Sequence, residues 1–361
     1  MLGKNIKMLH SFDSAKSLAE KYRYTGDKPL KSIRHFSNSA DGIKKLLASS
    51  GLQVTESITP KLYESLKTAC KNLNFPLKNV SAFVYSSPEL QAQCFESEEE
   101  NCVINVSSGL INLLNPNEVT FVIGHEIGHH ILGHNQEEER RVSAESFIGQ
   151  RAKEISVDRA GLIACQSLES SLRAIMKVIS GLPDEFIRFD TSNFINQLRA
   201  ADRQGATLQD SLATHPSLVL RARALLWFSM NCEIPLGHES GSMKLKKINE
   251  LVRRDLDRYI DKPVREKIKT AEDDLYFWSC VKTVTLKGKL LKEDREKLSR
   301  RFGEGNVNKL ISAVSEMSID EVAEFINQKI RTSSQELARI VPDSINERIK
   351  AIDKNVDKLN F

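Results

Sequence analysis

The 361-residue chain has no apolar run that approaches the roughly 18 residues of a membrane helix. Its N-terminus also lacks the apolar core of a secretory signal. The first eleven residues contain two lysines and no acid, which is weakly typical of organelle targeting, but Asp13 and Glu20 soon follow. These absences predict a cytoplasmic protein with no membrane span.

Paired cysteines are also missing. None of the six cysteines forms a CxxC motif and their spacing is irregular, so the sequence predicts neither a disulfide framework nor an all-cysteine zinc site. We expect reduced, partly buried thiols, as in cytoplasmic proteins. The cysteines are Cys70, Cys94, Cys102, Cys165, Cys232 and Cys280.

No charge of one sign dominates. The chain has 52 Lys and Arg against 48 Asp and Glu, a formal net charge of +4. This near balance predicts neither a nucleic-acid surface nor a membrane surface. With 40% hydrophobic and 28% charged residues, the composition is that of a globular protein, and the length predicts two or three domains.

The pattern along the chain predicts three regions. Residues 1–75 have mostly helical periodicity, and residues 76–235 combine short β-rich segments with longer helical ones. The β-rich segments 91–96 and 102–107 are joined by the acidic link SEEEN, which predicts a hairpin with a solvated turn. Residues 236–361 begin in a Pro/Gly-marked linker, continue as helices of mixed charge, and are a candidate surface for a protein partner.

Half of the eight histidines lie in one apolar stretch, FVIGHEIGHHILGHN, at residues 121–135. A helix is predicted to begin just before it, with Asn115 as the N-cap and Pro116 in the first helical position, or with Asn117 as a later cap. Within this helix, HEIGH matches the His-Glu-x-x-His motif of metallopeptidases.

Helical geometry explains the spacing of the motif. Residues four apart lie one above the other, so His125 and His129 can present two imidazoles to one zinc ion. Glu126 lies about 100° further round, where it can act as a general base on a water molecule. His130 and His134 point about 120–160° away from the first pair, and we expect them to be helix-end residues that face elsewhere.

A catalytic zinc ion needs a third protein ligand. The segment KEISVDRAG places Glu154 and Asp158 four apart on a predicted helix of residues 143–168. We predict that Glu154 is the third ligand and that Asp158 accepts a hydrogen bond that fixes the tautomer of a ligating imidazole. Ala160 and Gly161 would allow close helix packing beside the metal. An ordinary surface pair of carboxylates is the alternative interpretation.

Two more residues are candidates near the metal. The sequence Thr-His-Pro puts His215 at the entry to a helix, where it could bind the oxyanion of a tetrahedral intermediate or supply a fourth zinc ligand. A simple helix cap is the alternative for this histidine. Arg221, six residues further on, could orient the Glu or Asp side chains beside the zinc.

In order and spacing, HEIGHHILGH, EISVD and THPSLVLRARAL resemble the gluzincin metallopeptidases of family forty-eight, which include HtpX and the type 1 CAAX prenyl endopeptidases. The resemblance covers roughly residues 78–230. The residues that it implies are the zinc ligands His125, His129 and Glu154, the catalytic Glu126, and His215 near the metal.

The fold that the resemblance implies is α+β and predominantly α-helical, a zincin-like domain with a small antiparallel sheet and flanking helical regions. An extended substrate would pair with the edge strand at Gln93, Cys94 and Phe95. The family commonly has Asn-Ala-Phe-Ala before this strand, where this chain reads Gln-Ala-Gln-Cys. Because we find neither membrane helices nor an export signal, we do not expect prenyl-peptide or membrane-protein substrates.

We therefore expect a metalloendopeptidase with one Zn²⁺ per chain that hydrolyses a peptide or protein. Two alternatives stay open. The large share of sequence outside residues 76–235 suits a regulatory protease specific for one partner or repressor, and the metal motif also suits a latent or non-enzymatic zinc-binding scaffold. Glu126 argues against the scaffold, because a structural zinc site needs no base and is usually closed by four protein ligands.

Overall fold

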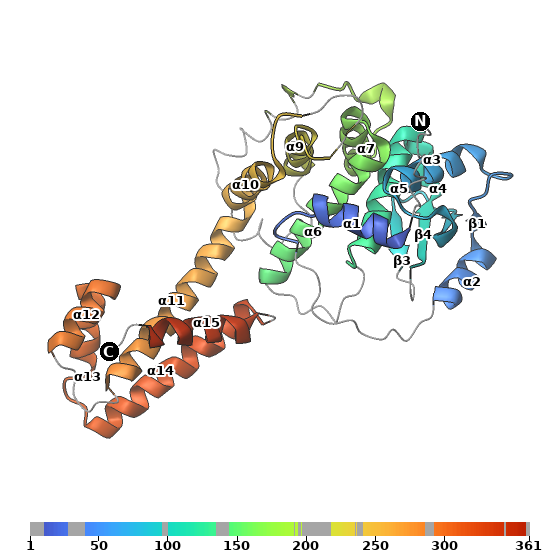
Figure 1. Cartoon of the computed structure of the whole chain (residues 1–361). Coiled ribbons are helices and arrows are strands. Elements are labelled where there is room, and N and C mark those ends of the chain that lie inside the picture. The colour runs from blue at the N-terminus through green and yellow to red at the C-terminus, as the bar shows by residue number, and fades with distance from the viewer. Residues whose placement is uncertain are drawn as a thin grey trace, which may run out of the picture. The chain divides into compact units, whose positions relative to one another are not determined.

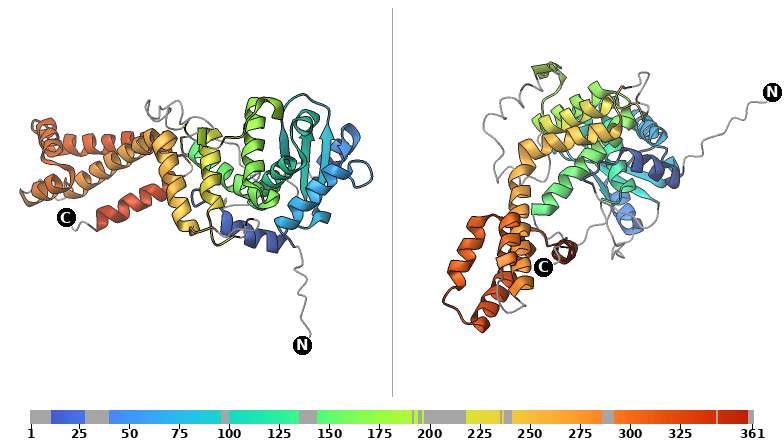
Figure 2. Two further views of the ribbon diagram at one scale, coloured as in Figure 1. Left: turned by 90° about the horizontal axis from the view of Figure 1, so that it is seen from above. Right: turned by 60° about the vertical axis from the view of Figure 1, so that its left-hand side comes forward.

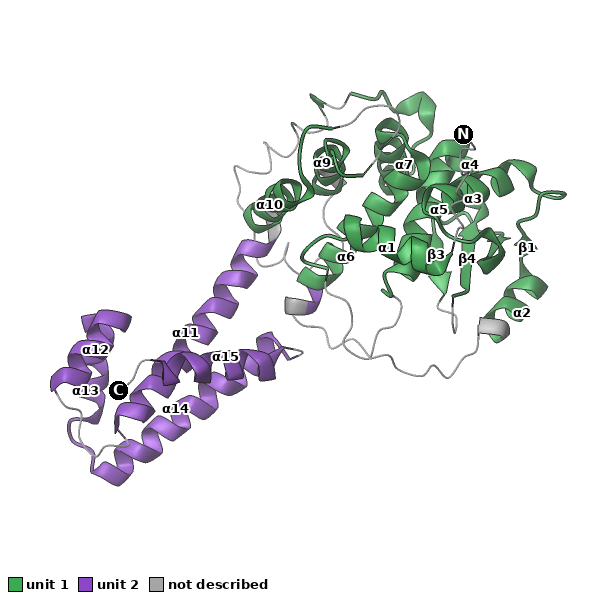
Figure 3. Cartoon of the chain, in the orientation of Figure 1, with its two compact units in different colours: residues 1–140, 148–206, 213–260 green, residues 141–147, 207–212, 261–361 purple. Residues whose placement is uncertain are grey.

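The computed structural model describes residues 11–27, 40–95, 100–134, 144–190, 192–193, 196, 218–234, 236, 241–285, 292–342 and 344–358. The chain divides into two compact units, coloured separately in Figure 3. The predicted site residues that the structure describes all fall in unit 1. Unit 1 comprises residues 1–140, 148–206 and 213–260, and unit 2 comprises residues 141–147, 207–212 and 261–361.

A four-stranded sheet with the order β1-β2-β4-β3 forms part of unit 1 (Figure 1). Strands β3 and β4 pair antiparallel, which confirms the predicted pairing of these two segments. The sheet is mixed, however, and not antiparallel throughout as expected, because β4 lies between β2 and β3 and runs parallel to β2. This order leaves β3 at an edge. The strands are β1 (Leu52–Gln53), β2 (Val80–Tyr85), β3 (Ala92–Phe95) and β4 (Cys102–Ser107).

Helices make up most of unit 1, so the predicted fold class, predominantly helical α+β, is confirmed. Helix α5 carries the HEIGH motif and packs against α3, α7 and strands β3 and β4. Its apolar residues Val119, Ile123 and Ile127 are buried in the main core of the unit. The helices are α1 (Phe12–Tyr22), α2 (Ala40–Ser50), α3 (Pro60–Asn72), α4 (Ser108–Leu113), α5 (Pro116–Ile131), α6 (Ala144–Cys165), α7 (Leu168–Ser180), α9 (Leu218–Ser229) and α10 (Leu245–Leu256).

A capping box and a buried ion pair stabilise the first turn of α5. Asn115 is the N-cap and its side chain accepts hydrogen bonds from the backbone amides of Asn117 and Glu118, with Pro116 in the first turn. Of the two predicted caps, the structure therefore selects Asn115. Glu118 completes a capping box and its Oε2 atom lies 2.8 Å from the Nζ atom of the buried Lys177 on α7. The helix that carries the motif is thus tied to the core at its first turn.

Helices α5 and α6 approach each other closely at glycine. A Cβ atom added at Gly124 would lie 2.2 Å from the Cβ atom of Ala164, and one at Gly161 would lie 2.7 Å from the ring of Phe121. Neither position has room for a side chain. The close packing predicted beside Gly161 is confirmed, and it brings the two predicted sets of metal ligands within reach of each other.

Unit 2 is entirely helical where the structure describes it. Helix α11 packs along α14 and α15, while α12 packs against α13, and Figure 2 shows these helices in orange to red from two further sides. No described helix of either unit is both long enough and apolar enough to span a bilayer. The predicted catalytic domain of residues 76–235, with one further region on each side of it, stays a prediction. The helices of unit 2 are α11 (Lys262–Thr285), α12 (Lys292–Phe302), α13 (Glu304–Val314), α14 (Ile319–Ile340) and α15 (Ile345–Asp357).

Candidate metal centre and active site

The structure brings together three predicted ligands from two helices. The Nε2 atoms of His125 and His129 on α5 are 3.2 Å apart. Glu154 on α6 reaches both, with one oxygen 3.8 Å from Nε2 of His125 and the other 3.7 Å from Nε2 of His129. The donor atoms of all three residues lie within 4.8 Å of one another. Two imidazole nitrogens and a carboxylate that converge in this way can hold a divalent ion such as zinc.

The outer nitrogen of His125 contacts a carboxylate. Its Nδ1 atom lies 3.2 Å from Oδ1 of Asp158, one turn after Glu154 on α6. Arg221 on α9 in turn donates two hydrogen bonds to Asp158, of 2.8 and 2.6 Å. Burial alone would raise the pKa of Asp158, but the charge and hydrogen bonds of Arg221 hold that pKa below its usual value. An ionised Asp158 keeps the proton of His125 on Nδ1 and leaves Nε2 free to bind a metal.

The outer nitrogen of His129 contacts another histidine. Nδ1 of His134 lies 3.2 Å from Nδ1 of His129, and Nε2 of His134 lies 3.0 Å from Oδ2 of the buried Asp27. One set of protons satisfies the whole chain: His129 donates from Nδ1, His134 accepts at Nδ1 and donates from Nε2, and Asp27 accepts. As for His125, this leaves Nε2 of His129 free to bind a metal.

The expectation that His134 faces away from the site was wrong. Helix α5 ends at Ile131, and Gly133 adopts a φ of +70°, the left-handed conformation that glycine tolerates. The amide of Gly133 then bonds the carbonyl of His130, and the amide of His134 bonds that of His129. This tight turn folds His134 back toward the helix, whereas the prediction treated it as helical.

His130 does face away from the predicted ligands. Its ring packs edge-on against Phe12 and Phe75, with centroids 5.8 and 5.7 Å away. Burial lowers the pKa of His130 to about 4, so the ring is neutral. Asp27 and His130 were not among the predicted site residues, and no local spacing in the sequence connects Asp27 with the motif.

Glu126 borders the same cavity as the three candidate ligands. Burial raises the pKa of its carboxyl group, while His125 and the backbone amide of Cys94 in β3 favour the ionised form. A carboxylate with a raised pKa is a stronger base than a solvated one. The position of Glu126 beside the ligands, and not among them, fits a base that acts on a bound water molecule.

A cavity of about 520 Å³ opens beside these groups. Strand β3 supplies one wall through residues that include Gln93 and Cys94, and α7 supplies another through Ala174 and Ile175. Phe95 is not among the lining residues, and its ring packs on the opposite side of the sheet with Leu47 and its neighbours. His215, which was predicted to lie near the metal, is outside the described residues. Arg221 lines the cavity.

Comparison with known proteins gives a family match. Residues 56–149 match the model of peptidase family M48. A relative is the Arabidopsis thaliana protein named plastoglobule-localized metallopeptidase 48, chloroplastic, which is 24% identical over 208 residues, covering 50% of this chain and 60% of the relative. The chain thus spans less than two thirds of that relative. No solved structure matches. The matched segment contains HEIGH but ends before Glu154, which joins the site through the geometry alone.

Proposed function

From the premise that residues 56–149 match the model of peptidase family M48, we propose that this chain is a zinc-dependent metalloendopeptidase. The observation that carries the proposal is the convergence of His125, His129 and Glu154 beside a cavity that also holds Glu126. The substrate is a peptide or protein.

The residues present suit zinc in three ways. Two imidazole nitrogens and one carboxylate oxygen are the donor set of a catalytic zinc site, which keeps a further position open for water or substrate. Both imidazoles have their Nδ1 atoms occupied by Asp158 and His134, so their Nε2 atoms are the free donors. The cavity lies on the side of Glu126, where a substrate can enter. One Zn²⁺ at this site is expected.

Zinc, when bound here, polarises the scissile carbonyl and acidifies a water molecule. Side chains of the protein transfer the proton and orient the two imidazoles. Glu126 removes a proton from the attacking water and delivers it to the departing amine nitrogen. Asp158 and Arg221 hold His125 in its ring orientation, and His134 does the same for His129.

An extended peptide is the form of substrate that suits this cavity. Strand β3 is at the edge of the sheet and Cys94 directs its backbone amide toward Glu126. A peptide that pairs with β3 would therefore lie across the catalytic carboxylate. The apolar residues Ala174, Ile175 and Val178 on the opposite wall favour apolar side chains next to the bond that is cut.

The variant Glu126→Gln tests the mechanism. The amide keeps the size of the side chain but cannot take a proton, so zinc content should be unchanged while cleavage of a peptide library falls by about 100-fold or more. Mass spectrometry of new termini, with and without a zinc chelator, measures both. Cleavage at the wild-type rate by Glu126→Gln would contradict the assignment of the base.

Regulated cleavage of a single partner is the second candidate function. Its support is unit 2, a separate compact helical unit that contributes none of the candidate site residues. Unit 2 would then bind the partner to be cut. Broad cleavage of unfolded casein by the purified chain would count against this alternative, and cleavage of one protein in a mixture would favour it. A cytoplasmic location stays a prediction from the sequence.

A further inference from the structure

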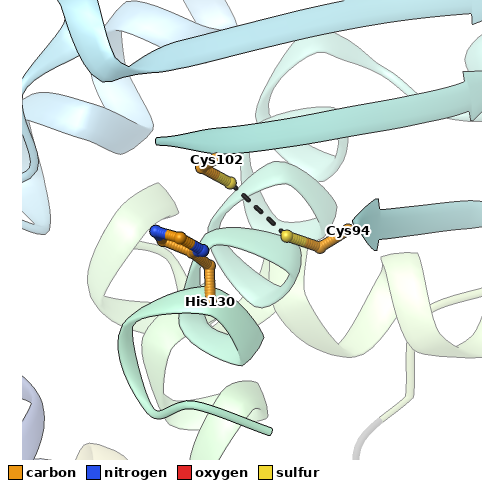
Figure 4. A group of neighbouring side chains, drawn as sticks. All are labelled: Cys94, Cys102 and His130. Atoms are coloured by element: carbon orange, nitrogen blue, oxygen red, sulfur yellow. Dashed lines mark hydrogen bonds between the residues drawn. The ribbon is translucent and has the colours of Figure 1, made fainter. Parts of the chain in front are cut away.

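A second group of metal-binding side chains lies next to the first along α5. The sulfur atoms of Cys94 and Cys102 and a ring nitrogen of His130 are within 4.8 Å of one another. The three residues come from β3, β4 and α5, and Figure 4 shows the imidazole beside the two thiols. The two sulfur atoms are 3.4 Å apart. Three elements of the fold therefore bring two thiols and an imidazole to one point.

This group is buried, and a ring nitrogen of its histidine lacks a hydrogen-bond partner. Cys102 is 0%, Cys94 6% and His130 9% exposed. The Nε2 atom of His130 has no hydrogen-bond partner, which is uncommon for a buried ring nitrogen. The Sγ atom of Cys102 meets the Sγ atom of Cys94, and a contact between two thiols is only a weak hydrogen bond. Hydrogen bonds among the polar atoms of the group therefore contribute little stabilisation.

We propose that Cys94, Cys102 and His130 form a second metal site that takes a thiophilic divalent ion, zinc, in a structural role. In a tetrahedral site with Zn–S bonds of about 2.3 Å, two thiolate sulfurs are about 3.8 Å apart. The two sulfurs need to separate by only a few tenths of an ångström from their present 3.4 Å. The existing backbone can therefore accommodate the ion with small side-chain movements.

Charge balance favours a divalent ion. On binding, each of the two thiols releases its proton to solvent, and two thiolates, a neutral imidazole and Zn²⁺ together carry no net charge. A monovalent ion would leave one negative charge in a buried place, which is costly. The fourth position of a tetrahedral site is left to water.

The second metal site would hold strand β3, with which a substrate peptide is proposed to pair, in place against helix α5. Cys94 belongs to the edge strand β3, and its backbone amide also bonds the carboxylate of Glu126. His130 follows the candidate ligand His129 directly. An ion that joins β3, β4 and α5 therefore keeps the edge of the sheet at a constant distance from the catalytic carboxylate.

Cobalt loading of the full chain tests the proposal independently of peptidase activity. The double variant His125→Ala/His129→Ala lacks the first site, so Co²⁺ bound to it reports on the second. Thiolate ligands give a sulfur-to-cobalt charge-transfer absorption in the near ultraviolet, which a site of two imidazoles and a carboxylate cannot produce. We expect this absorption in the double variant, and its loss when Cys94→Ser or Cys102→Ser is added.

Cys165→Ser in the same background is the matched control. Cys165 is also buried, but its thiol bonds Ser171 and belongs to neither group, so the absorption should persist. Absence of the absorption from the reduced double variant, or its survival in Cys102→Ser, would overturn the proposal. Loss of peptide cleavage in Glu126→Gln bears on the first site alone, so the two proposals can fail separately.

A measurement on the wild-type chain tests the proposal even if the cysteine variants fail to fold. The reduced protein is alkylated with and without added Zn²⁺, and modification is located by mass spectrometry. Zinc should slow alkylation of Cys94 and Cys102 at least 10-fold and leave the rate at the exposed Cys232 unchanged. Equal rates at Cys94 and Cys102 with and without zinc would count against the site. Wild-type protein should contain two zinc ions per chain by elemental analysis.

Discussion

The Nδ1 atom of His134 lies 3.2 Å from the Nδ1 atom of His129, beyond the end of the helix that carries the motif. The contact continues to Asp27 through the other nitrogen of His134, at 3.0 Å. His134, five residues after the motif, therefore accepts the Nδ1 proton of the candidate ligand His129 and fixes the tautomer of the His129 ring.

His134→Ala is expected to lower zinc affinity about 10–100-fold, because His129 loses the acceptor of its Nδ1 proton. The variant His134→Gln retains an amide oxygen that can accept this proton and should lose less. Competition with a chromogenic chelator measures both affinities. Equal affinity in wild type and His134→Ala would show that the contact has no orienting effect.

Arg221→Met should weaken the metal site and the fold together. It leaves the buried Asp158 charged with no cationic partner other than His125, at a cost of about 3–5 kcal/mol in unfolding free energy. Arg223→Met on the same helix is the control, since Arg223 pairs with Asp255 and does not line the cavity. Urea unfolding and zinc titration of both variants provide the measurement. A loss of zinc affinity in Arg223→Met as large as that in Arg221→Met would contradict the assignment.

Lys177→Met should destabilise unit 1 without touching the predicted ligands. Its Nζ atom lies 2.8 Å from Oε2 of Glu118, and both side chains are fully buried. Removing the cation leaves a buried carboxylate with fewer partners, which costs about 3–5 kcal/mol. Lys67→Met breaks the exposed pair with Glu64 and should cost about 1 kcal/mol at most.

Denaturant unfolding distinguishes these two lysine variants. A Lys177→Met chain as stable as Lys67→Met would mean that the buried pair contributes nothing to folding. The double variant Glu118→Gln/Lys177→Met should recover part of the loss, because it no longer buries a carboxylate that has lost its Lys177 partner.

Gly124→Ala is expected to force α5 and α6 apart. The added methyl group would lie 2.2 Å from Cβ of Ala164, and overpacking of this kind costs about 1–3 kcal/mol. Gly149→Ala is the matched control on α6, since a Cβ there meets nothing within 4 Å. It should leave stability unchanged or raise it by about 0.5–1 kcal/mol, because alanine favours a helix.

The second-site change Ala164→Gly tests whether the clash itself is responsible. The pair Gly124→Ala/Ala164→Gly removes the opposing methyl group and should recover most of the stability lost by Gly124→Ala. Thermal unfolding of the single and the double variant measures this recovery. If the pair is no better than the single variant, the two helices do not meet as described.

Features that depend on neighbouring residues were predictable. The Asn115 cap with Pro116 sets the start of α5, and the four-residue spacing puts His125 and His129 on one face of it, because a helix has a constant rotation per residue. The antiparallel pairing of β3 with β4 also followed from two short β-rich segments joined by a polar link. The parallel pairing of β2 with β4 did not, since strand order depends on how the connection crosses the sheet.

By itself, the sequence determined the helix that carries the HEIGH motif and two carboxylates four residues apart on a later helix. Tertiary structure alone decided that Glu154 faces both histidines, that Gly133 folds His134 back toward His129, and that Asp27 lies beside it. The same is true of Cys94, Cys102 and His130, which three separate elements bring together. The physical reason is that local spacing sets the direction of a side chain on its own helix or strand, whereas packing between elements sets which distant side chain it meets.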